Sequence, residues 1–216
     1  MPGSRQPSTC NVIVVANGKF PEHSIPLKLL QDAKVIVCCD GAAENVDRMG
    51  LTPRAIVGDL DSLSEKLKQK YNDSLFQDNN TEINDLTKAI RWCLANGYHQ
   101  VNIIGATGLR DDHTLGNIGL LPSYAQIGMK VKMYTDHGTI FPIIASTSIG
   151  SFKGQQVSIF SPNNDTNVTS FNLKYPIRER SLRELWMGTL NESLDNWFSL
   201  DFEPGPLIIF QEYSDF

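Results

Sequence analysis

Two acidic residues, Asp59 and Asp61, stand two positions apart in the stretch GDLDS, directly after the apolar run AIV. Carboxylates spaced this way on a tight turn can both reach one Mg²⁺ ion, whose remaining positions are usually filled by water and substrate phosphates. Ser62 could add a hydroxyl ligand or cap the helix expected after it. Aspartates are also frequent in ordinary turns, so the stretch by itself leaves a metal site and a capped turn both open.

A second group of charged side chains, Glu82, Asp85 and Lys88, recurs every three residues in the segment QDNNTEINDLTKAI. The segment begins a predicted helix, where backbone N–H groups and the helix dipole favour anions. Asp85 could therefore complete a metal site, and Lys88 could bind a phosphate. The alternative is a helix cap followed by an exposed acid–base pair.

A third segment, GATGLRDDHTLGN (105–117), combines a glycine-rich turn with charged residues. The turn around Thr107 and Gly108 lets backbone N–H groups approach a phosphate, and Arg110 adds a planar fork of donors. The spacing matches neither of the standard glycine-rich phosphate loops. Asp112 and His113 could bind a nucleoside, or Asp112 could cap the helix while His113 is structural.

These segments follow apolar runs that are predicted to be strands. Asn17, Asp40, Asp59 and Gly105 all fall at the ends of such runs. Ligands of open parallel sheets bind outside the carboxyl ends of the strands, so we expect these residues to converge on one crevice. Asp40 suits contact with a cationic ligand there, although it could equally be a helix N-cap.

The elements that must position these residues alternate along the first two-thirds of the chain. Continuous Val/Ile runs separated by helical stretches predict a parallel sheet covered on both faces, as in Rossmann-like α/β folds. Pro122 is expected to disturb the last of these helices. The predicted strands are 11–17, 34–40, 54–59, 100–106 and 130–136, and the predicted helices are 25–33, 41–50, 64–72, 84–97 and 113–128.

After about residue 140 the pattern changes to short alternating runs separated by Gly, Pro, Asn and Asp. Such runs are typical of an antiparallel β-sandwich or barrel. The sequence thus predicts an α/β domain over 1–140, followed by an antiparallel β-sandwich domain over 141–216. The boundary is expected near 138–150.

Composition narrows the functional classes. The 216 residues are 41% apolar with a formal net charge of −5, which argues against a nucleic-acid partner. The four cysteines lack zinc-site spacing and are expected to be buried, reduced thiols. The start of the chain carries no apolar leader, and no segment is long and apolar enough for a membrane span. We therefore expect a cytoplasmic protein without a membrane partner.

The ordered set VVANG, CCDGAAEN, GDLDS, NDLTKAI and GATGLRDDHTLGN resembles the thiamine pyrophosphokinase (thiamine diphosphokinase) family. In the last third, LKYPI and TLNES are similar to that family's KYPL and SN segments. The resemblance implies an α/β nucleotide-binding domain, a β-sandwich domain, and a homodimer whose active sites lie between subunits. It also implies transfer of the pyrophosphoryl group of ATP to the hydroxyethyl oxygen of thiamine, giving thiamine diphosphate and AMP.

The resemblance also implies roles for individual residues. The Mg²⁺-handling acids match Asp59, Asp61 and Asp85, and the thiamine side of the site matches Asp40 and Asn191. The nucleotide-binding turn matches Arg110, Asp112 and His113.

An aromatic contact to thiamine is expected from Trp197, with Trp186 as its competitor. Four positions depart from the usual family pattern: Glu82 stands at a common Asp, Asn84 at a common Thr, Leu109 at a Gly and Leu190 at a Ser. Two other functions remain open on the sequence. One is a Mg²⁺-dependent kinase or phosphohydrolase acting on another small alcohol or nucleotide, and the other is a non-catalytic nucleotide- or thiamine-sensing module.

Overall fold

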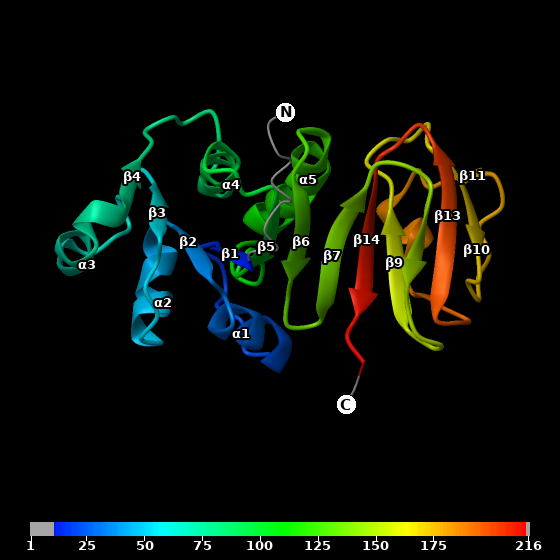
Figure 1. Cartoon of the computed structure of the whole chain (residues 1–216). Helices are drawn as coiled ribbons and strands as arrows, with labels where there is room; N and C mark the ends of the chain where they lie inside the picture. The colour runs from blue at the N-terminus through cyan, green and yellow to red at the C-terminus, as the bar shows by residue number, and fades with distance from the viewer. Residues whose placement is uncertain (1–10, 215–216) are drawn as a thin grey trace, which may run out of the picture.

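The computed structural model describes residues 11–214, which form a large sheet with helices on one half and a second sheet on the other (Figure 1). Six strands of the first half lie parallel in the order β4-β3-β2-β1-β5-β6. They are β1 (Val12–Val15), β2 (Val35–Cys39), β3 (Ala55–Gly58), β4 (Leu75–Gln77), β5 (Gln100–Ile104) and β6 (Lys130–Tyr134). The predicted parallel sheet is confirmed, and β4 is a short addition at its edge.

Helices cover both faces of this sheet, as predicted. Side chains along β1 point alternately to the two faces of the sheet, and both faces are covered, so all of its residues are apolar. Val12 and Val14 pack toward α4 (Asp85–Ala95) and α5 (Asp111–Gln126), whereas Ile13 and Val15 pack toward the other helices. The helices are α1 (Ser24–Gln31), α2 (Ala43–Arg48), α3 (Glu65–Lys70), α4 (Asp85–Ala95) and α5 (Asp111–Gln126), with 3₁₀ turns at Asp40–Ala42, Asn72–Ser74 and Leu185–Gly188.

The predicted break at Pro122 is absent, because α5 runs through this residue to Gln126. A proline inside a helix removes one backbone hydrogen bond. Pro122 and its neighbours Leu121 and Tyr124 are buried, so packing against the sheet holds the last turns of α5 in place. Tertiary packing thus overrides the local preference.

The last third forms the expected antiparallel β-sandwich. Its first sheet is a continuation of the parallel one: β7 pairs antiparallel with β6, and β14, β9 and β12 follow outward to make ten strands (Figure 1). The second sheet has the order β11-β10-β13-β8. These strands are β7 (Gly138–Ile143), β8 (Thr147–Gly150), β9 (Gln156–Phe160), β10 (Asn167–Phe171), β11 (Arg180–Ser181), β12 (Asn191–Glu192), β13 (Trp197–Glu203) and β14 (Leu207–Glu212).

A separate core fills the space between the two sheets of the sandwich. Phe141 and Ile159 of the long sheet pack in one apolar cluster with Phe198 and Leu200 of the short one. This is the arrangement that alternating strands produce when each buries one face. The two halves of the chain therefore have distinct cores but share one sheet.

The described cysteines are buried, as the sequence predicts. Cys38, Cys39 and Cys93 are buried free thiols, and Cys10 lies outside the described residues. Burial raises the pKa of the Cys93 thiol to about 12, so it stays protonated. Between residues 11 and 214, none of the helices combines the length and the apolar character that a bilayer span requires.

Candidate functional site

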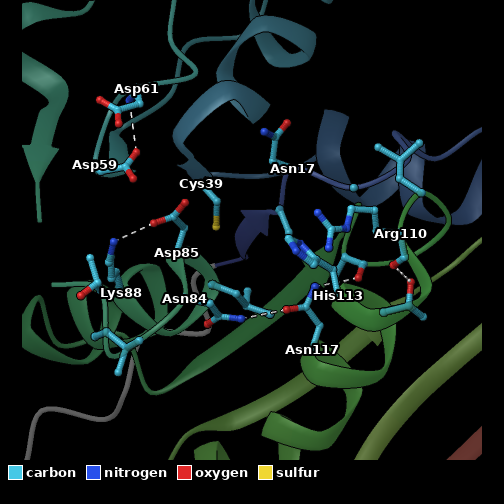
Figure 2. A pocket seen from close by; sticks show the side chains of 18 of the residues that line it. Asn17, Cys39, Asp59, Asp61, Asn84, Asp85, Lys88, Arg110, His113 and Asn117 are labelled. Atoms are coloured by element: carbon cyan, nitrogen blue, oxygen red, sulfur yellow. Dashed lines mark hydrogen bonds and ion pairs between the residues drawn. The ribbon is translucent and has the colours of Figure 1, made fainter. Parts of the chain in front are cut away.

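A cleft of about 690 Å³ opens where β1, β2, β3 and β5 end, between the first turns of α4 and α5 (Figure 2). This is where open parallel sheets bind their ligands. Most of the residues predicted from the sequence line it, namely Asn17, Asp59, Asp61, Asp85, Lys88, Thr107, Arg110 and His113. The predicted convergence of strand ends is therefore present in the fold.

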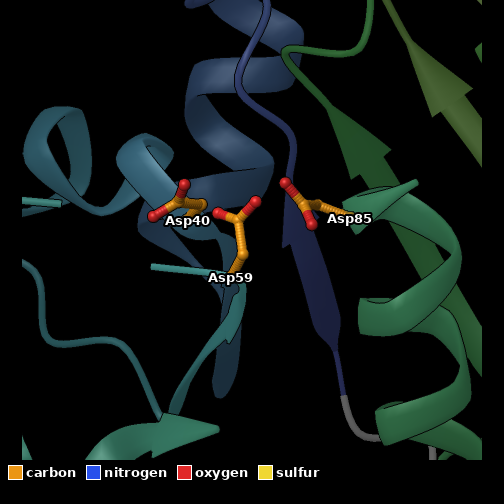
Figure 3. A group of neighbouring side chains, drawn as sticks. All are labelled: Asp40, Asp59 and Asp85. Carbon is orange, nitrogen blue, oxygen red and sulfur yellow. The ribbon is translucent and has the colours of Figure 1, made fainter. Parts of the chain in front are cut away.

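Three carboxylates meet at one side of this cleft. Asp40, Asp59 and Asp85 each offer an oxygen, and these oxygens lie within 4.8 Å of one another (Figure 3). This group includes Asp40, which the resemblance placed on the thiamine side, and does not include Asp61, whose part in binding Mg²⁺ stays a prediction. Asp61 lines the cleft beside the cluster, and its backbone N–H donates to Oδ1 of Asp59 at 3.1 Å.

Backbone geometry explains how the three acids come together. Asp40 follows β2 with a φ of 41°, and Leu60 follows Asp59 with a φ of 67°, both in the left-handed region that non-glycine residues seldom adopt. Leu60 is only 7% exposed and packs in the core, while the acids on either side of it face the cleft. Gly58 leaves the room they need, since a Cβ there would lie 3.0 Å from Cβ of Asp40 and 3.3 Å from Cγ of Asp85.

Asp40 is the most constrained member of the cluster, with only 3% of its surface exposed. Its Oδ2 accepts from the backbone N–H of Ser62 at 3.1 Å, whereas its buried Oδ1 has no hydrogen-bond partner among residues 11–214. Burial raises the pKa of Asp40; the Ser62 contacts offset this in part, and the charges of Asp59 and Asp85 raise the pKa further. A buried carboxylate beside two other carboxylates is costly unless a cation compensates it. The donor set suits Mg²⁺, which prefers carboxylate oxygens.

Lys88 provides a protein cation beside the cluster. Its side chain is 5% exposed, and Nζ lies 2.9 Å from Oδ1 of Asp85 one helical turn earlier. Burial lowers the pKa of Lys88, but the hydrogen bond and charge of Asp85 outweigh burial, so the net pKa is raised and the ammonium stays charged. The pair is thus buried on the lysine side rather than exposed, and it lines the cleft.

The turn between β5 and α5 forms the opposite wall. It packs against the loop after β1: Gly18 N–H donates to the Gly105 carbonyl at 2.7 Å, and Lys19 N–H to the Thr107 carbonyl at 2.8 Å. Gly108 has a φ of 88°, and a Cβ there would lie 2.8 Å from Cβ of Lys19. Only glycine combines this conformation with so close an approach.

Charged residues follow this turn at the start of α5. Arg110 holds Asp112 in a two-pronged contact, Nε to Oδ1 at 3.1 Å and Nη2 to Oδ2 at 2.5 Å. This contact, with the His113 N–H bond to Asp112 Oδ1 at 2.8 Å, lowers the pKa of Asp112 to about 2. Arg110 itself occupies the N-cap position of α5. Asp112 therefore fixes the guanidinium of Arg110 at the edge of the cleft.

Several lining residues were not expected from the sequence. Asn84 and Asn117 meet across the cleft floor, and Cys39 lies at its base (Figure 2). Asn117 is four residues after His113 on α5, so helical spacing places both on one face. That spacing is the signal from which Asn117 could have been inferred. Ser62, in contrast, lies behind Asp40 as a backbone donor, and the N-cap of α3 is Ser64.

Two predicted thiamine contacts lie outside this cleft. Asn191 is buried in the sandwich, where its side chain accepts from the Tyr175 N–H at 3.1 Å and donates to the Tyr175 carbonyl at 2.7 Å. Trp197 begins β13, pairs with Gly150 of β8, and is 39% exposed. Trp186 is 70% exposed in a 3₁₀ turn. None of these three residues lines the cleft of its own chain.

Comparison with known proteins agrees with this geometry. A family model described as "Thiamin pyrophosphokinase, catalytic domain" matches residues 27–133, and one described as "Thiamin pyrophosphokinase, substrate-binding domain" matches residues 138–210. Thiamine pyrophosphokinase 1 of Oryza sativa subsp. japonica is 28% identical over 165 residues, which cover 65% of this chain and 61% of that protein. Thiamine pyrophosphokinase of Bacillus subtilis (strain 168) is 30% identical over 100 residues, 43% of this chain and 46% of that protein.

The chain thus aligns with less than two thirds of the length of either of these relatives. A crystal structure of thiamine pyrophosphokinase from Bacillus subtilis superposes with a TM-score of 0.78 at 21% identity, covering 94% of this chain and 99% of that one. The two family models, placed end to end, span both halves of the fold described above. The chain therefore belongs to the thiamine pyrophosphokinase family.

Proposed function

We propose that this chain is a Mg²⁺-dependent thiamine pyrophosphokinase, which transfers the pyrophosphoryl group of ATP to the hydroxyethyl oxygen of thiamine. The oxygen attacks the β-phosphorus, the bond from that phosphorus to the α–β bridging oxygen breaks, and AMP leaves. The observation that carries the proposal is the cluster of Asp40, Asp59 and Asp85 beside a glycine-rich turn, in a chain of this family.

The acidic cluster would hold the metal. Asp40, Asp59 and Asp85 supply its oxygen ligands, and Asp61, which lines the cleft next to them, remains a predicted fourth member acting directly or through water. When bound, Mg²⁺ neutralises charge on the phosphates of ATP. Asp61 and Asp85 are the two candidates for accepting the hydroxyl proton, because both face the cleft.

Residues on both sides of the cleft would bind the nucleotide. Lys88 and Arg110 are placed to balance the negative charge of the phosphates, which phosphoryl transfer requires above all else. The turn at Thr107 and Gly108 offers a close backbone approach for the same groups. Two further predicted nucleotide contacts, Asn17 and His113, line the cleft and would touch the nucleotide directly. Asp112 would act indirectly, by holding Arg110.

Thiamine would be held between two copies of the chain. Asn191 and Trp197 lie outside the cleft of their own chain, and a homodimer would bring the partner's sandwich over it. A division into a nucleotide- and metal-binding part (1–140) and a thiamine-binding part (141–216) is supported by two family models that meet between residues 133 and 138. A cytoplasmic location, and the lack of a nucleic-acid partner, remain predictions from the sequence.

Product analysis tests the proposal. Purified protein is incubated with ATP, thiamine and Mg²⁺, and nucleotides are separated by chromatography. AMP that forms only with thiamine present is the expected result, whereas ADP would indicate an ordinary kinase and neither product a sensing module. Asp59→Asn keeps an Oδ1 acceptor for the Asp61 N–H but removes the charge, so AMP formation is expected to fall at least about 100-fold.

A further inference from the structure

A chain of side-chain hydrogen bonds crosses the floor of the cleft from α4 to the turn before α5 (Figure 2). Asn84, the N-cap of α4, accepts with Oδ1 from the Thr87 N–H at 3.0 Å. Its Nδ2 donates to Oδ1 of Asn117 at 3.0 Å, and Nδ2 of Asn117 donates to the Ala106 carbonyl at 2.9 Å. Two amides thus connect two backbone groups that are distant in sequence.

The backbone groups at both ends of this hydrogen-bonded series determine which amide atom of each asparagine donates and which accepts. The Thr87 N–H can only donate, so it selects the oxygen of Asn84; the Ala106 carbonyl can only accept, so it selects the nitrogen of Asn117. The remaining nitrogen of Asn84 then faces the remaining oxygen of Asn117, which is the pairing observed. Bonds aligned in this way polarise and strengthen one another.

The two sides of the proposed site lie next to this series of hydrogen bonds. Asp85, a member of the acidic cluster, directly follows Asn84, and Thr107 of the nucleotide turn directly follows Ala106. We propose that Asn84 and Asn117 form a positioning pair, which fixes the distance between the metal-binding acid and the nucleotide turn. The proposal rests on the proposed function for the identity of the ligand, Mg²⁺–ATP.

The fold does not depend on this pair alone. On its buried side, Oγ1 of Thr87 lies 2.8 Å from the hydroxyl of Tyr124, which joins α4 to α5 a second time. Burial raises the pKa of Tyr124 to about 12, so this hydroxyl stays protonated. Loss of the Asn84–Asn117 contact is therefore expected to leave the helices packed while freeing the turn to move relative to Asp85.

A double-mutant cycle with Asn84→Ser and Asn117→Ala tests the pairing. Serine is as good an N-cap as asparagine, so Asn84→Ser keeps an oxygen acceptor for the Thr87 N–H and hydroxyl, and it removes the amide nitrogen that reaches Asn117. The matched control is Asn96→Ser at the far end of α4. It removes a side-chain amide bond to the backbone carbonyl of Trp92. Binding of Mg²⁺–ATP is measured by calorimetry, and KM for ATP and thiamine by steady-state kinetics.

We expect each single variant to weaken Mg²⁺–ATP binding about tenfold, as for residues that orient metal ligands, with KM for thiamine unchanged. The double variant should be no weaker than either single one, because both remove the same contact. Losses that multiply to about 100-fold would mean independent contacts with the nucleotide and would overturn the pairing, as would singles that match Asn96→Ser. Absence of thiamine-dependent AMP from the wild type would refute the proposed reaction but not the pairing, which is judged on Mg²⁺–ATP binding.

Discussion

Asp40 is a single residue whose buried carboxylate destabilises the metal-free fold at the proposed site. Its free oxygen, its burial and the nearby charges of Asp59 and Asp85 all disfavour the ionised form. Functional groups are commonly held in such unfavourable surroundings, because the ligand then supplies the missing compensation. The cost should therefore be visible in the stability of the metal-free protein.

Asp40→Asn tests this cost. Asparagine tolerates the left-handed backbone at this position and carries no charge. Since the pKa of Asp40 is higher in the folded than in the unfolded state, its contribution favours folding below the unfolded pKa and is lost as pH rises through the folded one. Without Mg²⁺ at pH 7, the variant is expected to melt about 2–4 °C above the wild type, and the difference should shrink as the pH is lowered.

Addition of Mg²⁺ is expected to reverse that order, because only the wild type keeps all three acids. Thermal melting with and without Mg²⁺ measures both effects on the same samples. An Asp40→Asn variant that Mg²⁺ stabilises as strongly as the wild type would remove Asp40 from the metal site.

At the scale of the element, the end of β3 determines how closely the acids approach one another. Gly58 is the last residue of the strand, and a methyl group there would press on Asp40 and Asp85. Glycine at the end of β3 therefore allows the carboxylates of the cluster to lie close together.

Gly58→Ala is expected to raise the Mg²⁺ concentration needed for half-maximal activity about tenfold, since the acids must move apart. Gly119→Ala is the matched control: Gly119 lies inside α5, and outside the backbone of that helix no described atom comes within 4 Å of an added Cβ. It should raise the free energy of unfolding by about 0.5–1 kcal/mol and leave the Mg²⁺ requirement unchanged. A Mg²⁺ titration and a urea titration of both variants distinguish these effects, and equal Mg²⁺ requirements would count against crowding at Gly58.

Strands and helices were easier to predict from the sequence than the side-chain contacts within the cleft. Continuous apolar runs identified the parallel strands and, through their ends, the crevice that gathers Asn17, Asp59 and Lys88. The approach of Asp40 to Asp59 and Asp85 accompanies the left-handed φ of Asp40 and Leu60, which residue type and spacing do not specify. The Asn84–Asn117 contact joins residues 33 positions apart, so local spacing could not reveal it.

At the scale of the whole molecule, one sheet runs through both halves of the chain. β6 pairs with β7 at the junction, through Met133 with Ile140 and Tyr134 with Thr139. The change to alternating runs near residue 140 correctly predicted a sandwich, but alternation does not say which earlier strand its first strand joins. The junction is therefore a strand pair inside one continuous sheet (Figure 1). Asn191 on β12 and Trp197 on β13, which are predicted to bind thiamine, belong to the sandwich and do not line the cleft.

Subunit complementation tests whether a homodimer completes the site. Asp59→Asn and Trp197→Ala chains are co-expressed with different tags, and the mixed dimer is isolated. If each site combines the cleft of one chain with the sandwich of the other, one of the two sites in the mixed dimer escapes both substitutions. Its activity should then be about half that of the wild type, well above either variant homodimer, whereas a site built within one chain would leave the mixed dimer as poor as its parents.

We propose that the cleft transfers two phosphoryl groups of ATP together, and the fate of a label in ATP distinguishes this reaction from its alternatives. Protein is incubated with thiamine, Mg²⁺ and ATP carrying ³²P at the γ-position, and the products are separated. We expect labelled thiamine diphosphate and unlabelled AMP in equal amounts, with both lost in Asp59→Asn. Labelled thiamine monophosphate with ADP, or labelled inorganic phosphate alone, would contradict it.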